Sequence, residues 1–272
     1  MKPLANHVIL YDANCPMCNI YTAAFVKTKM LDVNGRSPYQ EIPTNLCPYV
    51  DMNRAVNEIA LVNKETGQVS YGIASIFKIL GNTMPIFKPL FGFKPFIWLM
   101  SKCYALISFN RKVIVPAKPK INEHLPDFKL HYRLIYLFLS WLIVAYILTH
   151  YAKAMSPTVP LGNAYREYLI CGGQLVFQSI ICLFYRPAKT WDYLGNMMTI
   201  SLAGSLLLLP MLWIGSVFNL SSLPYIAYFM FTAGLMLLEH LRRSKILELG
   251  LLLSISWVVY RLLVLGLMIT HI

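Results

Sequence analysis

Long apolar runs separated by short polar segments fill the second half of the chain. A helix needs about 20 mainly apolar residues to cross the hydrocarbon core of a bilayer. Five runs approach or reach that length, near residues 132–150, 168–185, 194–215, 223–239 and 249–270. The pattern therefore predicts a membrane domain, residues 131–272, made of about five transmembrane helices.

Shorter apolar stretches in the first half predict a small α/β domain. The run His7–Tyr11 predicts a buried strand, and a helix is expected from Pro16 to about Leu31. Residues 84–112 are apolar, aromatic and interrupted by prolines, which predicts two or three short helices packed on the sheet or on the bilayer surface. The other expected elements are a strand at 38–43, irregular chain at 44–55, a hairpin of strands at Glu58–Asn63 and Val69–Tyr71, and a helix from about Ile73 to Leu80.

This order of elements, strand, helix, strand, hairpin and helix, is that of a thioredoxin-like fold. The expected domains are a thioredoxin-like domain at 1–112, a linker rich in proline and lysine at 113–130, and the membrane domain at 131–272. The fold class is thus an α/β thioredoxin-like N-terminal domain followed by an all-α transmembrane helical bundle.

The distribution of basic residues predicts which side of the membrane each loop and terminus lies on. The chain has 272 residues, of which 57% are hydrophobic and 13% charged, and a net charge of +12. No signal peptide is evident, and alternate loops are basic, which places them and the N-terminal domain on the cytoplasmic side and the C-terminus outside. The expected location is the inner (cytoplasmic) membrane. Because topology and lipid contact explain the basic residues, and no nucleic-acid motif is present, nucleic-acid binding is not expected. The basic loop residues are Lys118, Lys120, Lys129 and Arg133; Arg186 and Lys189; and Arg242, Arg243 and Lys245.

The motif that carries chemistry is Cys15-Pro-Met-Cys18, which directly follows the first strand. Cys15 falls at the expected helix N-cap and Pro16 at the first helical position, where proline fits best. Unpaired N–H groups at a helix N-terminus stabilise a thiolate and lower the pKa of its thiol. We therefore expect Cys15 to be the attacking thiol, exposed at the cap, and Cys18 to be the more buried resolving thiol.

Asp12 lies three residues before Cys15, at the end of the strand. Its carboxylate is a candidate general base for the Cys18 thiol. The other interpretation is that it caps the loop by accepting hydrogen bonds from backbone N–H groups. Both interpretations stay open at the level of sequence.

A cysteine pair of this spacing can also belong to a structural zinc site or arise by chance within a helix. A structural zinc site needs four ligands, but the chain has no second CxxC and no HxxxH. Only the isolated residues Cys47, Cys103, His7 and His124 are available to complete one. The strand–CPxC–helix context favours a working dithiol over both, so no metal and no cofactor are expected.

The spacing Asp12-x-x-Cys15-x-x-Cys18 after a hydrophobic strand resembles the signature of the DCC family of thiol–disulfide oxidoreductases. Further matches are "GIAS" (72–75) after the hairpin and "YALISFNR" (104–111), which is similar to the family's closing Tyr…Asn-Arg segment. The resemblance covers about residues 7–112. It implies a thioredoxin-like fold and dithiol exchange, with Asp12, Cys15 and Cys18 as the functional positions. This chain departs from the family in having Ala13 where glycine is usual.

These features predict a membrane-bound thiol–disulfide oxidoreductase that exchanges electrons with a partner protein thiol, a small thiol or a membrane acceptor. In the alternative, the membrane bundle is the working part, as a transporter, lipid-handling module or scaffold, and the dithiol is regulatory or vestigial. Arg261, midway along the last apolar run, is costly in a bilayer and should face the bundle interior. Such polar residues serve either as helix-packing contacts or as a site for a quinone, lipid headgroup or small substrate. The other candidates are Gln174, Gln178 and Asn196, and Cys182 is a candidate relay for electrons from Cys18.

Overall fold

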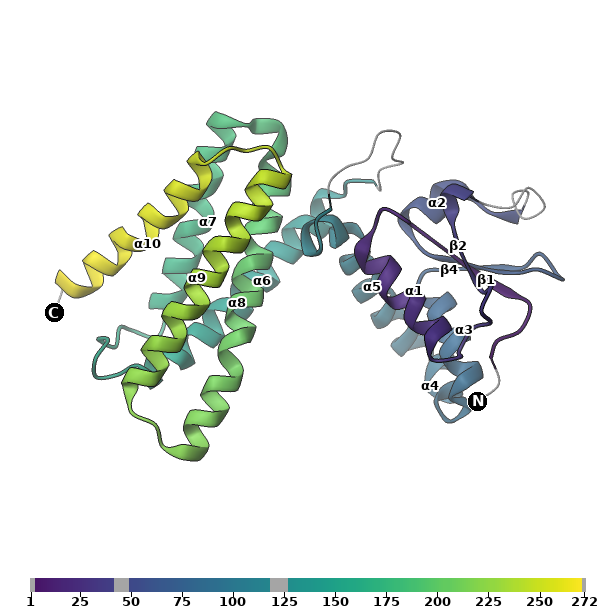
Figure 1. Cartoon of the computed structure of the whole chain (residues 1–272), viewed down its shortest axis with the longest axis horizontal. Helices are drawn as coiled ribbons and strands as arrows, with labels where there is room; N and C mark the ends of the chain where they lie inside the picture. Colours follow the sequence, from purple (N-terminus) through teal and green to yellow (C-terminus); the bar gives the residue numbers. More distant parts are fainter. Residues whose placement is uncertain (1–2, 42–48, 118–126, 271–272) are drawn as a thin grey trace. The chain divides into compact units, whose positions relative to one another are not determined.

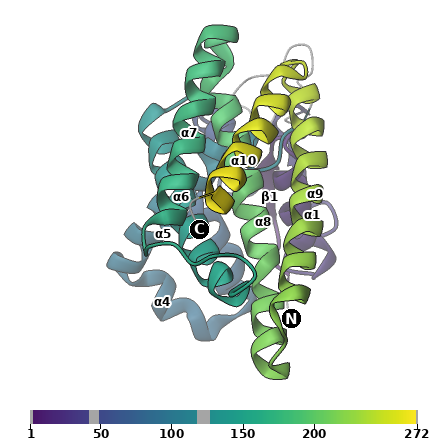
Figure 2. The same cartoon turned by 90° about the vertical axis from the view of Figure 1, so that its left-hand side faces the viewer.

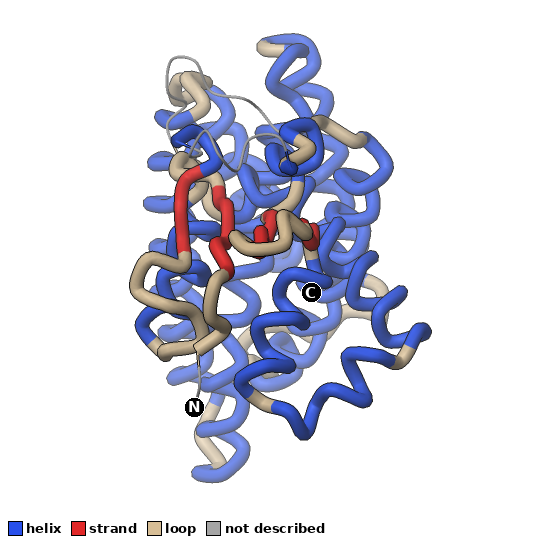
Figure 3. The backbone as a smooth tube through the Cα atoms, turned by 90° about the vertical axis from the view of Figure 1, so that its right-hand side faces the viewer, coloured by secondary structure: helices blue, strands red, loops and turns tan. Residues whose placement is uncertain are grey.

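The computed structural model describes residues 3–41, 49–117 and 127–270. The chain divides into two compact units, Met1–Tyr132 and Arg133–Ile272. Helices make up most of it, and the one sheet in the described part of the chain belongs to the N-terminal unit, as Figure 3 shows.

The N-terminal unit contains four strands and helices on both sides of them. The strands are β1 (His7–Tyr11), β2 (Arg36–Pro38), β3 (Ala60–Asn63) and β4 (Val69–Tyr71). The helices are α1 (Pro16–Lys27), η1 (Tyr39–Glu41), α2 (Met52–Asn57), α3 (Ile73–Thr83), η3 (Pro85–Phe87), α4 (Lys88–Gly92) and α5 (Lys94–Ile114).

The strand order in the sheet is β2-β1-β3-β4. Strand β1 pairs in parallel with β2, and the β1–β3 and β3–β4 pairs are antiparallel. Ile9 lies opposite Arg36 on one side and Leu61 on the other. All five residues of β1 are buried. The strand that precedes the cysteine motif is therefore an inner strand, which fixes the position of the motif firmly.

The two faces of the sheet bury different apolar clusters, because successive side chains of a strand point to opposite faces. Ile9 and Leu61 pack with Ile79 and with partly buried side chains of α1 and α5. Val8 and Leu10 pack on the other face with apolar residues that include Ala55 of α2. Figure 1 shows the same arrangement, with α1 and α3 on one side of the sheet and α2 on the other.

Several boundaries differ from those expected. Helix α1 ends at Lys27 and not near Leu31, because Lys29 adopts a left-handed conformation (φ +57°) that ends the helix. Strand β2 is Arg36–Pro38, and Tyr39–Glu41, expected to belong to a strand at 38–43, form η1; residues 42–43 lie outside the described residues. Strand β2 stops at proline, which has no N–H for further ladder bonds.

The stretch 44–55, expected to be irregular, contains the start of helix α2. Asp51 caps this helix, since its Oδ1 accepts a hydrogen bond from Arg54 N at 3.2 Å. Residues 44–48 lie outside the described residues. The expected hairpin is observed as strands β3 and β4. The helix expected after it is observed as α3, which extends to Thr83.

Residues 84–112 form η3, α4 and α5, and α5 is a single helix of 21 residues where only short helices were expected. Each of the prolines 85, 89 and 95 stands in the first turn of a helix, where its missing N–H costs nothing. No proline follows Pro95 until Pro116. The prolines therefore begin these helices, and none of them interrupts α5.

The second unit is a bundle of helices, seen in Figure 2. Among the described residues, four helices are long and apolar enough to cross a membrane: α6 (Leu130–Ala154), α7 (Arg166–Tyr185), α8 (Thr190–Phe218), which follows the short η4 (Pro187–Lys189), and α9 (Ser222–Ile246). The number is five if η3, α4 and α5, which bend by 88°, count as one broken span. The fifth apolar run forms α10 (Leu252–Thr270), whose apolar stretch Leu252–Met268 is shorter than the others.

Candidate dithiol site

The two cysteines lie at the junction between strand β1 and helix α1. Cys15 is the N-cap of α1, with an extended backbone (φ −94°, ψ 108°), and Pro16 begins the helix. The Cys15 sulfur accepts a hydrogen bond from the backbone N–H of Cys18 at 3.3 Å. The sulfur therefore takes the place of the oxygen that usually caps a helix, as the sequence predicted.

Both cysteines are free thiols, and both are buried. Cys15 is 6% exposed and Cys18 is 3% exposed. The expectation that Cys15 is exposed at the cap is therefore wrong. Tyr11, Met17 and Tyr21 pack around the pair and cover it. The sulfur that should attack a partner is reached only by a slender group or after a small movement of these side chains.

The two thiols have opposite pKa shifts. A hydrogen bond from the Cys18 side chain lowers the pKa of Cys15 to about 7; burial opposes this shift, and the Cys18 N–H and the charge of Arg111 assist it. The negative charge of Asp12 works to raise the same pKa. The hydrogen bond to Cys15, followed by burial, raises the pKa of Cys18. Near neutral pH the Cys15 thiolate is thus well populated while Cys18 keeps its proton.

Asp12 accepts hydrogen bonds at both carboxylate oxygens. Its Oδ2 receives Arg111 Nη2 at 3.2 Å, and its Oδ1 receives Gln40 Nε2 at 2.9 Å and Asn14 N at 3.0 Å. The Asp12 and Arg111 side chains are 3% and 5% exposed. These contacts match the capping interpretation of Asp12 and add a buried ion pair to it. The general-base interpretation stays a prediction.

Arg111, which ends the Tyr…Asn-Arg segment noted in the sequence, is a member of the site that the sequence analysis did not expect there. It lies on α5, and its guanidinium also donates to the carbonyl oxygens of Val56, at 2.8 Å, and Asn57, at 3.4 Å. Two other polar residues share its helix face: the Tyr104 hydroxyl accepts a hydrogen bond from Ile59 N at 3.0 Å, and the Ser108 hydroxyl donates to Asn57 O. Their spacing, 104, 108 and 111, is that of one face of a helix. Polar residues at this spacing within an apolar helix were the sequence signal that this face of α5 contacts the rest of the N-terminal unit.

No group of three or more His, Cys, Asp or Glu residues that could hold a metal ion occurs in the described part of the chain. Of the candidate zinc ligands, Cys47 and His124 lie outside that part. Cys103 is exposed on α5. His7 Nδ1 makes a 2.7 Å hydrogen bond with Ala5 O.

In the second unit, Arg133–Ile272, a network of hydrogen-bonded, buried polar side chains connects four helices. The Tyr193 hydroxyl (α8) donates to Gln178 Oε1 (α7) at 2.9 Å and lies 3.2 Å from His240 Nε2 (α9). His240 Nδ1 lies 3.0 Å from the Ser254 hydroxyl (α10), and the Ser256 hydroxyl donates to Gln178 Oε1 at 3.2 Å. Gln178 thus belongs to a hydrogen-bonded network, which is what helix-packing contacts require.

The other polar candidates of the bundle have partners of their own. The Arg261 guanidinium lies 4.0 Å above the centre of the Trp257 ring, one turn earlier on α10. Gln174 Nε2 donates to Trp257 O at 3.3 Å, and Asn196 Oδ1 accepts from Arg243 Nη1 at 3.0 Å. Cys182 is buried in this unit, and the relay from Cys18 to it stays a prediction.

Comparisons of this chain with protein-family models, with curated proteins and with solved structures find no match.

Proposed function

We propose that the chain is a membrane-bound thiol–disulfide oxidoreductase in which Cys15 and Cys18 cycle between dithiol and disulfide. The observation that carries this proposal is geometric: Cys15 and Cys18 are free thiols at the N-terminus of α1, and the Cys15 sulfur accepts a hydrogen bond from the Cys18 N–H at 3.3 Å. The lowered pKa of Cys15, about 7, supports the same assignment. An attacking thiol works best when its pKa is close to the ambient pH. Cys15 meets that condition.

The exchange proceeds in two steps. The Cys15 thiolate attacks one sulfur of a partner disulfide, forming a mixed disulfide and releasing the partner's other sulfur as a thiolate. Cys18 then loses its proton and attacks the Cys15 sulfur, which releases the second partner thiol and leaves a Cys15–Cys18 disulfide. The partner gains two electrons and the chain loses two. The reverse sequence, with a dithiol partner, reduces Cys15 and Cys18 again.

The fold and the family resemblance support the same proposal. A thioredoxin-like assignment is supported by the strand order β2-β1-β3-β4, by the single parallel pair, and by the dithiol after the first strand. Membership of the DCC family rests on Asp12, Cys15 and Cys18 and on the closing segment that ends at Arg111. The buried Asp12–Arg111 pair gives a physical reason for both ends of that pattern to be present.

In the cell, we propose that this unit lies on the cytoplasmic side of the inner membrane. Four or five helices are long and apolar enough to span a bilayer. The basic loops favour a cytoplasmic N-terminal unit. Its partner would then be a protein thiol, a small thiol or a membrane electron acceptor.

The test of this function is to trap the mixed disulfide. In Cys18→Ser, the resolving thiol is gone, so the Cys15–partner bond should persist. Incubation of this variant with oxidised glutathione is expected to add one glutathione at Cys15, detected by mass spectrometry. The matched control is Cys15→Ser, in which Cys18 should stay unmodified. Equal modification of both variants, or of neither, would rule out the assigned roles.

The alternative function makes the membrane bundle the working part, as a transporter or lipid-handling module. The observation that favours it is a set of buried nitrogen atoms without a hydrogen-bond partner, Gln178 Nε2, Trp257 Nε1 and Arg261 Nε, close to the polar network. Loss of the physiological activity in Arg261→Leu, with Cys15→Ser active at normal protein level, would favour this alternative. The reverse result would favour dithiol exchange.

A further inference from the structure

The bend between α3 and the middle of α5 exposes a dense set of large apolar side chains. We refer to residues 85–102, which comprise η3, α4 and the first turns of α5, as the elbow. Ile86 is 84% exposed and Trp98 is 65% exposed. The other exposed apolar residues of the elbow are Phe87, Leu90, Phe93 and Leu99. Soluble surfaces rarely gather so many large apolar side chains unless another surface covers them.

The charge of this region has one sign. Residues 66–122 contain no aspartate or glutamate. Four lysines, Lys78, Lys88, Lys94 and Lys102, lie on or beside the elbow, and none of them forms an ion pair with another described residue. Large apolar groups mixed with unpaired lysines are the composition of a segment that lies in the interface of an anionic membrane.

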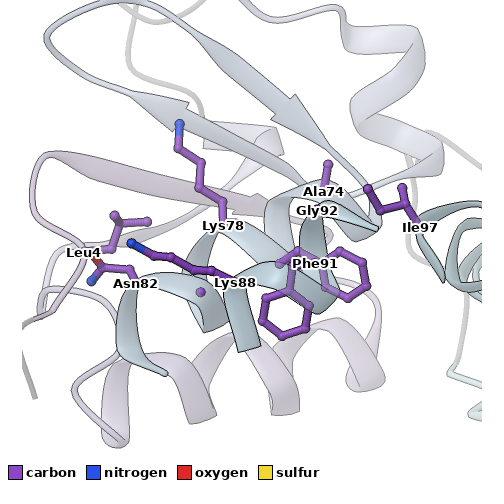
Figure 4. Close-up of a pocket in the computed structure, with 10 residues that line it drawn as sticks. Leu4, Ala74, Lys78, Asn82, Lys88, Phe91, Gly92 and Ile97 are labelled. Atoms are coloured by element: carbon purple, nitrogen blue, oxygen red, sulfur yellow. The ribbon is translucent and has the colours of Figure 1, made fainter. Parts of the chain in front are cut away.

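A pocket of about 500 Å³ adjoins the elbow and combines the same two properties. It lies between α3 and α4, with Leu4 and Ile97 at its borders. In Figure 4 the amino groups of Lys78 and Lys88 extend away from the Phe91 ring. The two ammonium groups are available to lipid phosphates, while the aromatic side offers a surface for the start of an acyl chain.

The elbow is fixed to the N-terminal unit at both ends. Phe77 of α3 stacks on Phe91 at 4.6 Å and on Phe96 at 5.6 Å between ring centres. The later part of α5 is held through Tyr104 and Arg111, which hydrogen-bond to the backbone of residues 56–59. A segment held in this way can lie on a bilayer, but crossing one would break these contacts. Its 88° bend fits the same conclusion.

We infer that the elbow and its pocket are a binding surface for anionic phospholipids, independent of the dithiol chemistry. The elbow inserts its apolar side chains at the headgroup level, and the four lysines contact lipid phosphates. Helix α6, which is long and apolar enough to span the bilayer, starts at Leu130, only a short stretch of chain after α5 ends at Ile114. Exposed apolar side chains together with lysines and no acidic residue match the apolar and anionic layers of a lipid interface, which favours lipid over a soluble partner as the occupant.

The experiment reconstitutes the full chain in nanodiscs of phosphatidylcholine, alone or mixed with phosphatidylglycerol. A trace of phosphatidylcholine with a photoactivated group in its acyl chain labels the residues that touch lipid, and mass spectrometry locates the label. Labelling of helix α8 serves as the internal reference. We expect the peptide 86–99 to be labelled, and to be labelled more strongly when phosphatidylglycerol is present.

The triple variant Lys78→Gln, Lys88→Gln, Lys94→Gln should reduce that labelling at least about fivefold in the mixed nanodiscs. The matched control is Arg54→Gln with Lys64→Gln, two exposed basic residues, one on α2 and one directly after β3, which should change nothing. Unlabelled elbow peptides beside a labelled α8 would overturn the proposal and point to a protein partner or a second copy. Labelling that ignores both phosphatidylglycerol and the lysines would overturn it as well.

Discussion

Cys15 combines two properties that have opposite effects on its reactivity. Its lowered pKa, about 7, makes the thiolate available near neutral pH. Its burial, together with Tyr11, Met17 and Tyr21, restricts what can reach the sulfur. A thiol of this kind reacts readily with a small or well-fitted partner and slowly with a bulky one. Selectivity by access is therefore expected at this site.

The rate of alkylation of Cys15 should follow its thiolate fraction. With iodoacetamide, we expect the rate to rise with pH to a midpoint near 7, because the thiolate is the nucleophile. A bulky maleimide should react far more slowly at every pH. Mass spectrometry of Cys15 after timed quenching measures both rates. A rate that rises only above about pH 8.5, the value of a free cysteine, would contradict the lowered pKa.

The charges next to Cys15 should move this midpoint in opposite directions. Arg111→Gln removes a positive charge that lowers the pKa of Cys15, so the midpoint should rise. Asp12→Asn removes a negative charge that raises it, so the midpoint should fall. The same alkylation series measures both variants. A shift of the same sign in both would show that the charges do not act on Cys15 as described.

The same pair should be important for stability. Removing one partner of a buried ion pair costs about 3–5 kcal/mol, because the other charge is left buried and unpaired. Arg111→Gln should therefore destabilise the N-terminal unit strongly, and the double variant with Asp12→Asn should recover part of the loss. Proteolysis of the full chain in increasing urea measures the change. Arg54→Gln, which breaks the largely exposed Arg54–Glu58 pair, is the control and should cost about 0–1 kcal/mol.

At the scale of elements, the sequence predicted those strands, helices and caps that depend on residues adjacent in the chain. Strand β1 and the cap at Cys15 follow from a short apolar run and from Cys-Pro at a helix start. The contact between Asp12 and Arg111 joins residues 99 positions apart, so no local pattern carries it. The burial of Cys15 was missed for the same reason, since the side chains that cover it are placed by the packing of β1 and α1.

Helix α5 illustrates how one element supports the sheet from outside. Tyr104 accepts a hydrogen bond from the N–H of Ile59, a buried residue just before β3. Helix α5 therefore closes a gap in the backbone hydrogen bonding of the sheet. Its last turns also carry Arg111, so a displaced α5 would disturb the dithiol site.

Tyr104→Phe tests this link. It leaves the Ile59 N–H buried without a partner, which should cost about 1–3 kcal/mol of stability. Tyr71→Phe is a matched control, since the Tyr71 hydroxyl also accepts a backbone N–H, that of Asp51, but in an exposed setting. Its cost should be clearly smaller, because water can replace the lost acceptor. Equal costs in urea unfolding of the two variants would contradict the role given to Tyr104.

At the scale of the whole molecule, the number of spans decides where the termini lie. Helices α6, α7, α8 and α9 are long and apolar enough to cross a membrane, while α10 has a shorter apolar stretch. If α10 also crosses, the total is five and the termini lie on opposite sides. If it lies along the surface, the total is four and they share a side.

We expect five crossings, with the elbow on the surface and the C-terminus outside. Reporter fusions at the two ends test this, with a fluorescent protein that matures in the cytoplasm and a phosphatase that is active outside it. The N-terminal fusion should fluoresce and the C-terminal phosphatase fusion should be active. An inactive C-terminal phosphatase together with a fluorescent C-terminal fusion would show that α10 does not cross.

The most direct test of the proposed dithiol chemistry is a redox titration of the full chain, in which each sample is quenched and unfolded before its free thiols are labelled with a maleimide of known mass. We expect a reversible two-electron transition that involves Cys15 and Cys18, with a midpoint between about −270 and −120 mV, the range of known dithiol enzymes. The transition should be absent in both Cys15→Ser and Cys18→Ser. If the two sulfurs do not pair at any potential, the dithiol is not a redox centre and the central claim is wrong.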